Sequence, residues 1–267
     1  MGRLTGKVAL ISGGARGQGE SEARMFAQEG AKVVFGDILD GQGQMVESDI
    51  NKDGGDAKYI HLDVTKESDW VSAVEVTEKT YGKLDILVNN AAQINPKGVL
   101  DMPYSEFKEQ MASIIDGTFL WTKYAAKSMV ENGIKGSIIN VITCAAWQGE
   151  PGNVGYTTSK AGVLNFTRSV AMELAQYGIR VNNMTPTATQ PEDEEAISRR
   201  NQKSKMMDSR SFKMDYDAVP LGRKPTPSDY LPAFLYLASD DSSMVTGSNL
   251  TVDGGVLAKY WPWYPQV

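Results

Sequence analysis

Residues 7–19 read KVALISGGARGQG, and this stretch decides the fold class. Its first half, Lys7–Ser12, is apolar without alternation, which is typical of a strand buried on both faces. The second half is rich in glycine and leads into a helix-length segment, Gly19–Glu29. Glycines allow a tight strand-to-helix turn and let a phosphate approach the backbone amides at a helix N-terminus. The loop residues that we expect to contact a dinucleotide are Gly13, Arg16, Gly17, Gln18 and Gly19.

The alternation of strand and helix continues along the chain of 267 residues. Further strands are predicted at Lys32–Gly36, Ala57–Leu62, Asp85–Asn89, Gly136–Ile142, Ile179–Met184 and Asn249–Val252. Further helices are predicted at Glu67–Tyr81, Tyr104–Glu131 and Asn153–Tyr177. Such alternation gives a parallel sheet covered by helices on both faces. The predicted fold is therefore α/β: one Rossmann-type domain over residues 1–267, doubly wound, with a parallel sheet of about seven strands.

The composition excludes several classes of function. A net charge of −6 argues against binding of a phosphate backbone, so no nucleic-acid partner is expected. The chain has one cysteine, Cys144, and one histidine, His61, which excludes an internal disulfide and a Cys/His metal site. His61 lies in the strand-like run AKYIHLDV and is interpreted as a strand residue, not as the base of a catalytic triad. No metal is expected.

The chain also lacks the marks of a membrane or exported protein. No charged and then apolar leader precedes the first strand, and no run of 18 apolar residues occurs. We expect a soluble, cytoplasmic protein without a membrane partner.

A carboxylate ends the second predicted strand, VVFGD, at Asp37, 18 positions after Gly19. An acid here accepts hydrogen bonds from the adenosine ribose and repels a 2′-phosphate, which favours NAD over NADP. Arg16 is the one contrary residue, since a loop arginine could bind that phosphate. At the ends of the next two strands, Asp63 with Val64 and Asn90 are expected to border the adenosine half of the cofactor.

The segment YTTSK places Tyr156 and Lys160 four residues apart, on one face of a predicted helix. A free phenol has a pKa of about 10, and a lysine ammonium one turn away favours the phenolate. Tyr156 is therefore the expected acid/base group, and Lys160 its partner and a ligand of the nicotinamide ribose. Thr143, at the end of the preceding strand, is expected to bind the substrate oxygen, although a threonine also simply fits a strand.

Two segments depart from the strand–helix pattern. Residues Thr187–Ala218 are rich in charge and methionine and follow the carboxyl end of a strand, which favours a substrate lid over a solvated insertion. Large apolar side chains suit a flat, hydrophobic substrate, unless they only pack internally; they are Trp147, Met206, Met207, Phe212 and Met214. The aromatic tail at residues 259–267, KYWPWYPQV, is expected to dock on a neighbouring subunit.

Together these stretches resemble the short-chain dehydrogenase/reductase family across essentially the whole chain. The matching pieces are SGGARGQG, FGDILD, LDVT, LVNNAA, SIINVIT, YTTSKAG, GIRVNNMTP and SSMVTGSNLTVDGG. Within the family, the cofactor half looks most like bacterial hydroxysteroid dehydrogenases of the 3α/20β type. The resemblance implies Tyr156 as acid/base, Lys160 as its partner, Thr143 in the usual place of a serine, and a homotetramer.

The chain departs from the family pattern at three places. The asparagine that the family carries in its central helix, where it helps to hold a water that links the lysine to solvent, falls on Ile114 in SIIDGTF. Ser113 or Asp116 are candidates to compensate, from other angles on the helix. Thr187 replaces a glycine after Pro186, and Thr189 is expected to contact the nicotinamide carboxamide. The family's NNAG reads NNAA, a minor change.

The residues leave three functions open. The leading one is an NAD-dependent oxidoreductase that interconverts a secondary alcohol and a ketone, on a hydroxysteroid or bile acid. The second keeps this chemistry on a small cyclic alcohol, a sugar or an acyl ketone. The third is a weakly catalytic NAD-binding protein with a regulatory or structural role.

Overall fold

The computed structural model describes residues 2–191 and 219–259, which include seven parallel strands in one sheet. The strands are β1 (Val8–Ser12), β2 (Lys32–Asp37), β3 (Asp56–His61), β4 (Ile86–Asn89), β5 (Ser137–Val141), β6 (Arg180–Pro186) and β7 (Asn249–Val252). Their order in the sheet is β3-β2-β1-β4-β5-β6-β7. This order reverses direction at β1 and β4, as in doubly wound sheets that bind ligands at such a switch point. The predicted fold class is confirmed.

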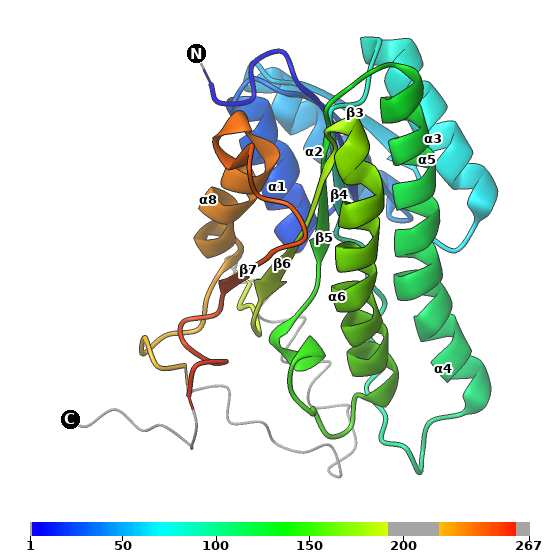
Figure 1. Cartoon of the computed structure of the whole chain (residues 1–267), viewed down its shortest axis with the longest axis vertical. Helices are drawn as coiled ribbons and strands as arrows, with labels where there is room; N and C mark the ends of the chain where they lie inside the picture. Colours follow the sequence, from blue (N-terminus) through cyan, green and yellow to red (C-terminus); the bar gives the residue numbers. More distant parts are fainter. Residues whose placement is uncertain (1, 192–218, 260–267) are drawn as a thin grey trace.

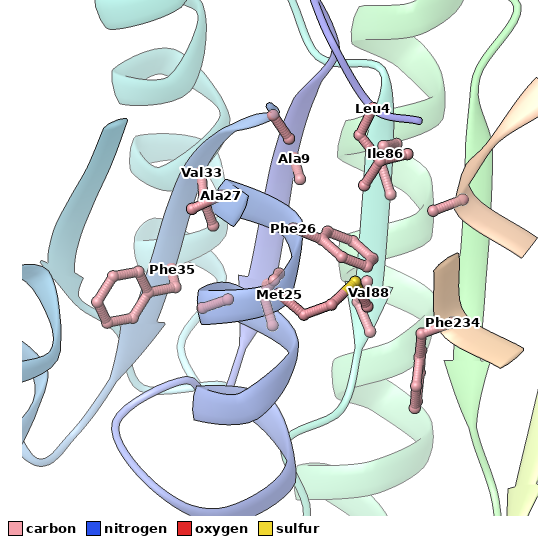
Figure 2. Packing of buried hydrophobic residues seen from close by; sticks show 14 of the residues in the cluster. Leu4, Ala9, Met25, Phe26, Ala27, Val33, Phe35, Ile86, Val88 and Phe234 are labelled. Atoms are coloured by element: carbon pink, nitrogen blue, oxygen red, sulfur yellow. The ribbon is translucent and has the colours of Figure 1, made fainter. Parts of the chain in front are cut away.

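Helices cover both faces of the sheet (Figure 1). One face carries α1 (Gly17–Gln28), α2 (Asp40–Lys52) and α8 (Pro227–Ala238), which share one apolar core with the sheet. The other face carries α3 (Glu67–Tyr81), α5 (Gly117–Glu131) and α6 (Val154–Leu174). Figure 2 shows the first core, in which Phe26 of α1 points toward Ile86 and Val88 of β4. β1, β4 and β5 are buried along their whole length, which explains why their sequences run apolar without alternation.

The predicted long helix Tyr104–Glu131 is interrupted, which corrects that part of the prediction. α4 (Tyr104–Met111) ends in a π-helical turn, Ala112–Asp116, before α5 continues. Ile114, at the centre of the turn, is fully buried and packs in an apolar cluster with Ile142 and Val163. A π-helical turn needs no proline or glycine, and ASIID contains neither, so no helix-breaking residue in the sequence marks it.

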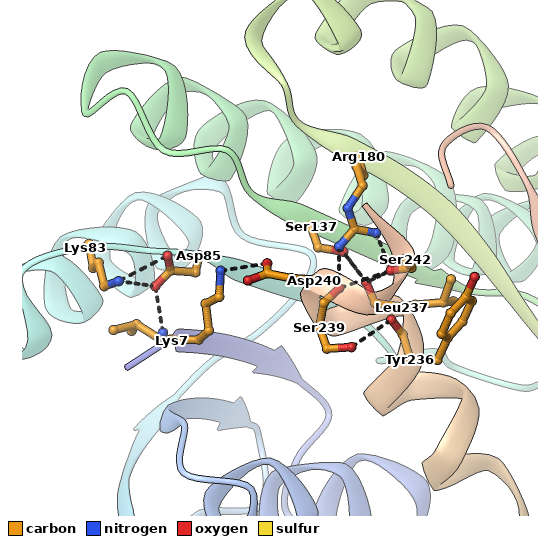
Figure 3. A network of polar contacts seen from close by, with 11 residues as sticks. Lys7, Lys83, Asp85, Ser137, Arg180, Tyr236, Leu237, Ser239, Asp240 and Ser242 are labelled. Carbon is orange, nitrogen blue, oxygen red and sulfur yellow. Dashed lines mark hydrogen bonds and ion pairs between the residues drawn. The ribbon is translucent and has the colours of Figure 1, made fainter. Parts of the chain in front are cut away.

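The two edges of the sheet differ in character. Because all strands are parallel, their carboxyl ends meet at one edge, and the glycine-rich loop, Asp37, Asn90 and Thr143 follow there. The opposite edge carries a polar network in which Arg180 contacts Ser242 and two carbonyls at the end of α8 (Figure 3). The chemistry and this network therefore occupy separate ends of the molecule.

Two predicted features fall largely outside the described residues. Of the lid, only residues 187–191 are described, so Met206, Met207, Phe212 and Met214 lie outside. The tail is described only at Lys259. Within the described ranges, no helix has the length and apolar character needed to cross a membrane.

Candidate active site

The glycine-rich loop lies between β1 and α1 and has a backbone that only glycine accommodates well. Gly13 and Gly17 have φ angles of +70° and +61°, in the left-handed region. At Gly19 a Cβ atom would lie 2.2 Å from the carbonyl oxygen of Gly13 and 2.6 Å from Asn90 Nδ2. No side chain caps α1, whose N-cap is Arg16. The loop thus presents a helix N-terminus without obstruction, as an anionic pyrophosphate requires.

Asn90 fixes the glycine loop to the end of β4. Its Nδ2 donates to the carbonyl oxygens of Ser12 and Gly13 at 3.1 and 3.2 Å. The Ser12 hydroxyl in turn accepts from the backbone N–H groups of Asn90 and Ala91. Asn90, predicted as a cofactor contact, therefore also holds the shape of the loop.

Gln18 links the loop to a buried acid that the sequence pattern did not single out. Its Nε2 donates to Glu22 Oε1 at 3.1 Å and lies 3.5 Å from Asn90 Oδ1. Glu22 is fully buried, and burial raises its pKa to about 8, partly offset by the bond from Gln18. Glu22 therefore carries its proton at neutral pH. Glutamate in an amphipathic helix ordinarily faces solvent, so the sequence gives no sign that the Glu22 side chain points inward.

Asp37 ends β2 directly beside the glycine loop. Its carboxylate accepts from the backbone N–H groups of Ala15 and Leu39, both at 3.2 Å. The hydroxyl of Tyr59 donates to the Asp37 carbonyl at 2.6 Å. These contacts hold a negative charge next to the loop, where the sequence pattern predicts it.

Asp63, Val64 and His61 lie at the end of β3. Asp63 accepts from the Thr65 hydroxyl and backbone N–H, and these bonds lower its pKa. The carbonyl of Val64 accepts from Trp70 Nε1 at 3.2 Å. His61 is the last residue of β3, with Nδ1 2.9 Å from Asp40 Oδ1, so the interpretation of His61 as a strand residue is confirmed.

Tyr156, Lys160 and Thr143 come together at the carboxyl end of β5. Lys160 Nζ lies 5.9 Å from the centre of the Tyr156 ring and donates to the Val141 carbonyl at 2.6 Å. The Thr143 hydroxyl lies close enough to the Tyr156 phenol to lower the pKa of that phenol. α6 begins at Val154, so the phenol and the amine occupy its first two turns. The predicted grouping of these three residues is present.

The electrostatics of this group differ from the expectation in one respect. Burial raises the pKa of Tyr156 to about 12, partly offset by the nearby Thr143 hydroxyl, while the charge of Glu150 adds to the rise. Burial lowers the pKa of Lys160 to about 8. In the chain by itself, Lys160 therefore does not bring the phenol below its usual pKa. The reason is that removal from water penalises both charged forms, the phenolate and the ammonium.

Two further predicted contacts, Trp147 and Thr189, have other partners in the structure. Trp147 is 43% exposed, and its ring lies 5.9 Å from the Arg168 guanidinium, 12 positions after Tyr156 on α6. Thr189 donates to the carbonyl of Thr187 and contacts the Tyr230 hydroxyl at 3.1 Å. These contacts within the chain do not test binding of a ligand, so the contact of Trp147 with substrate and that of Thr189 with the nicotinamide carboxamide stay predictions.

Ile114 and its neighbours do not supply the polar group that the family pattern carries in the central helix. Ile114 is buried among apolar side chains that pack against Tyr156. Ser113 donates its hydroxyl to the Gln110 carbonyl at 3.1 Å, and Asp116 is exposed. Ser113 therefore uses its hydroxyl hydrogen within its own helix, and Asp116 lies at the surface. Within the described ranges, no three His, Cys, Asp or Glu side chains are grouped as metal ligands.

Comparisons with known proteins identify the family. A family model described as enoyl-(acyl carrier protein) reductase matches residues 13–257. The crystal structure of a short-chain type dehydrogenase/reductase from Mycobacterium marinum has a TM-score of 0.83 and 32% identity, covering 96% of this chain and 97% of that one. The chain belongs to the short-chain dehydrogenase/reductase family. It is an oxidoreductase of the class that acts on CH–OH groups.

The relatives of this dehydrogenase differ in substrate. The 3-alpha-(or 20-beta)-hydroxysteroid dehydrogenase of Mycobacterium tuberculosis is 40% identical over 257 residues, 96% of this chain and 92% of the relative. The trans-4-hydroxycyclohexanecarboxylate dehydrogenase of Sinomonas cyclohexanicum is 37% identical over 262 residues, 96% of this chain and 95% of the relative. Members of the family typically use nicotinamide cofactors. The uncapped helix α1, the absence of a side chain at Gly19 and the carboxylate of Asp37 fit such a group.

Proposed function

We propose that this enzyme is an NAD-dependent dehydrogenase that interconverts a secondary alcohol and a ketone through Tyr156. The observation that carries the proposal is the grouping of Thr143, Tyr156 and Lys160 at the edge of the sheet that also carries the glycine loop. The preference for NAD is supported by Asp37, whose carboxylate opposes the extra phosphate of NADP.

The chemistry follows from the residues of the chain. A bound nicotinamide supplies the acceptor or the donor of hydride. In the oxidation direction, the Tyr156 oxygen takes the hydroxyl proton of the substrate, and in the reduction direction it returns that proton to the carbonyl oxygen. Thr143 holds the substrate oxygen against the phenol. Lys160, fixed by the Val141 carbonyl, orients the ribose and favours the phenolate whenever its amine is protonated.

Two classes of substrate are supported by named relatives. A hydroxysteroid or bile acid is favoured by the 40% identity to a hydroxysteroid dehydrogenase. A small cyclic alcohol is favoured by the 37% identity to a hydroxycyclohexanecarboxylate dehydrogenase. We give precedence to the steroid, since the resemblance is stronger there and a hydrophobic alcohol or ketone suits the apolar residues of the lid. A homotetramer, with the tail docked on a neighbouring subunit, belongs to the same proposal.

The test is a scan of steroids, bile acids and small alcohols with NAD and NADP, followed by NADH absorbance. We expect turnover of a secondary alcohol with NAD. Tyr156→Phe should lower kcat by at least about 100-fold, because it removes the proton carrier and leaves the ring in place. An enzyme that binds NADH but oxidises no alcohol, or one whose turnover survives the loss of the hydroxyl, would contradict the proposal.

A further inference from the structure

The turn that precedes α6 holds a pair of polar side chains that the reaction described above does not use. Glu150 and Asn153 lie between Thr143 and Tyr156 in the chain. Asn153 Nδ2 donates to Glu150 Oε2 at 3.2 Å. Glu150 is half-buried, and the described residues offer it no cation: its one hydrogen bond comes from a neutral amide.

Asn153 lies at the start of α6, where an asparagine side chain ordinarily caps the helix. It is the N-cap residue of α6, and asparagine at an N-cap usually accepts a hydrogen bond from the first turn of the helix. Here the side chain makes no capping bond. Its amide turns to Glu150 instead, and Oδ1 is buried without a partner among the described groups, although the residue is only 7% exposed. A buried acceptor without a donor is unfavourable and calls for an explanation in function.

The pair lies within electrostatic reach of the reacting phenol, since the charge of Glu150 raises the pKa of Tyr156. A negative charge there opposes formation of the phenolate, so it does not serve the proton transfer itself. The loop after β4 closes the other side of this turn: the backbone N–H of Val154 donates to the Lys97 carbonyl at 3.4 Å. The turn therefore lies next to Tyr156, between the end of β5, which carries Thr143, and the first turn of α6.

We infer that Glu150 and Asn153 form a specificity site for a second hydroxyl group of the substrate. Asn153 Oδ1 is fully buried, so a ligand of this site meets the carboxylate oxygens of Glu150, which Asn153 Nδ2 holds in place, and it must donate hydrogen bonds. A neutral hydroxyl satisfies these acceptors with a smaller desolvation cost than an ammonium group. This inference rests on the proposed function and narrows its substrate to alcohols with a further hydroxyl.

Matched pairs of alcohols test this. We would measure KM and kcat with cyclohexanol against cyclohexanediol, and with a monohydroxy steroid against a dihydroxy steroid of the same skeleton. In at least one pair, wild type is expected to prefer the dihydroxy member by about tenfold or more in kcat/KM, the effect of one hydrogen bond to a charged group. Glu150→Gln should abolish this preference by raising KM for the dihydroxy member alone. Asn153→Ser, which keeps a capping side chain, should lower the same ratio.

Glu109→Gln is the control, since it removes the same charge from an exposed position of α4. It should leave the ratio unchanged. A wild type without preference in either pair, equal losses on both members in Glu150→Gln, or a stronger preference for an amino alcohol would overturn the inference and leave the dehydrogenase function standing. Failure of wild type to oxidise any alcohol would overturn the proposed function, and this inference with it.

Discussion

At the scale of single residues, Lys160 combines a functional position with a cost in stability. It is 3% exposed, and burial lowers its pKa from 10.5 to about 8. Below pH 8 the amine is charged in both the folded and the unfolded state, and the folded state bears the full cost of a buried ammonium. Between pH 8 and 10.5 the unfolded state binds more protons, so this residue makes the free energy of unfolding rise with pH.

Lys160→Met should therefore stabilise the fold while it abolishes turnover. We expect the free energy of unfolding at pH 7 to increase by about 1–3 kcal/mol, because an apolar side chain of similar length replaces a buried charge. Urea unfolding at pH 7 and at pH 10 measures this, and the gain should be smaller at pH 10. A Lys160→Met variant that is less stable than wild type at pH 7 would contradict the inference that the buried ammonium of Lys160 destabilises the fold.

Asp37 is expected to set the choice of cofactor. Asp37→Ala should lower the ratio of kcat/KM with NAD to kcat/KM with NADP by at least about tenfold, or about 1.4 kcal/mol, since the charge that opposes the 2′-phosphate is gone. Asp40→Ala is the control: this acid lies three positions on and contacts Tyr59 and His61 instead of the loop. An unchanged ratio in Asp37→Ala would contradict the proposal that this carboxylate makes the enzyme prefer NAD over NADP.

At the scale of elements, the glycine-rich loop and α1 depend on the close approach at Gly19. Gly19→Ala would force a methyl group to within 2.2 Å of the Gly13 carbonyl, so the loop must move away from Asn90. We expect the Kd for NADH, measured by fluorescence titration, to rise by at least about tenfold, as the loop no longer fits the pyrophosphate.

Gly41→Ala is the matched control, since Gly41 lies in α2 and a Cβ there has nothing within 4 Å. It should leave the Kd for NADH unchanged and stabilise the fold by about 0.5–1 kcal/mol through helix propensity. Similar effects of the two substitutions on NADH binding would show that the clash at Gly19 does not matter.

The elements also show what a sequence can reveal. Six of the seven predicted strands agree with the structure to within a residue at each end, and only β6 extends two residues further, to Pro186. The apolar runs of β1, β4 and β5 reflect burial of every residue, whereas β3 and β7, at the two sides of the sheet, are only partly buried. The grouping of Thr143, Tyr156 and Lys160 was predictable from helical periodicity and strand ends. The π-helical turn at Ala112–Asp116 was not, because it contains no proline or glycine that would mark a break in the helix.

Other features of the site depend on three-dimensional burial, which a sequence does not encode locally. The raised pKa of Tyr156 arises from loss of water, and only packing determines that loss. Glu22 is buried and protonated in a helix where a glutamate would ordinarily face solvent. Asn153 at the start of α6 is a typical helix-capping residue by sequence, and only the structure shows that its amide contacts Glu150 instead.

At the scale of the whole molecule, the sheet separates a polar network at one edge from the chemistry at the other. At the amino edge, Arg180 of β6 reaches across to the end of α8 (Figure 3). Its guanidinium donates to Ser242 Oγ at 2.7 Å and to the carbonyls of Leu237 and Ser239 at 3.0 and 3.1 Å. Ser137 of β5 donates to the same Leu237 carbonyl at 2.7 Å. The carbonyls that a helix leaves unpaired at its end are thus satisfied by two strands of the sheet.

Arg180→Met should therefore weaken the fold without a change in the chemistry. The substitution keeps part of the apolar stem and removes three hydrogen bonds from a charged donor, while Ser137 and Ser242 still donate to the carbonyls at the end of α8. We expect a loss of about 2–4 kcal/mol in the free energy of unfolding, measured in urea, with KM for cofactor and substrate within about twofold of wild type. Arg3→Ala, which breaks an exposed pair with Asp241, is the control and should cost less than about 1 kcal/mol. A variant at Arg180 with normal stability and an altered KM would show that the two edges are coupled, because an effect on the site would then have to travel along the strands.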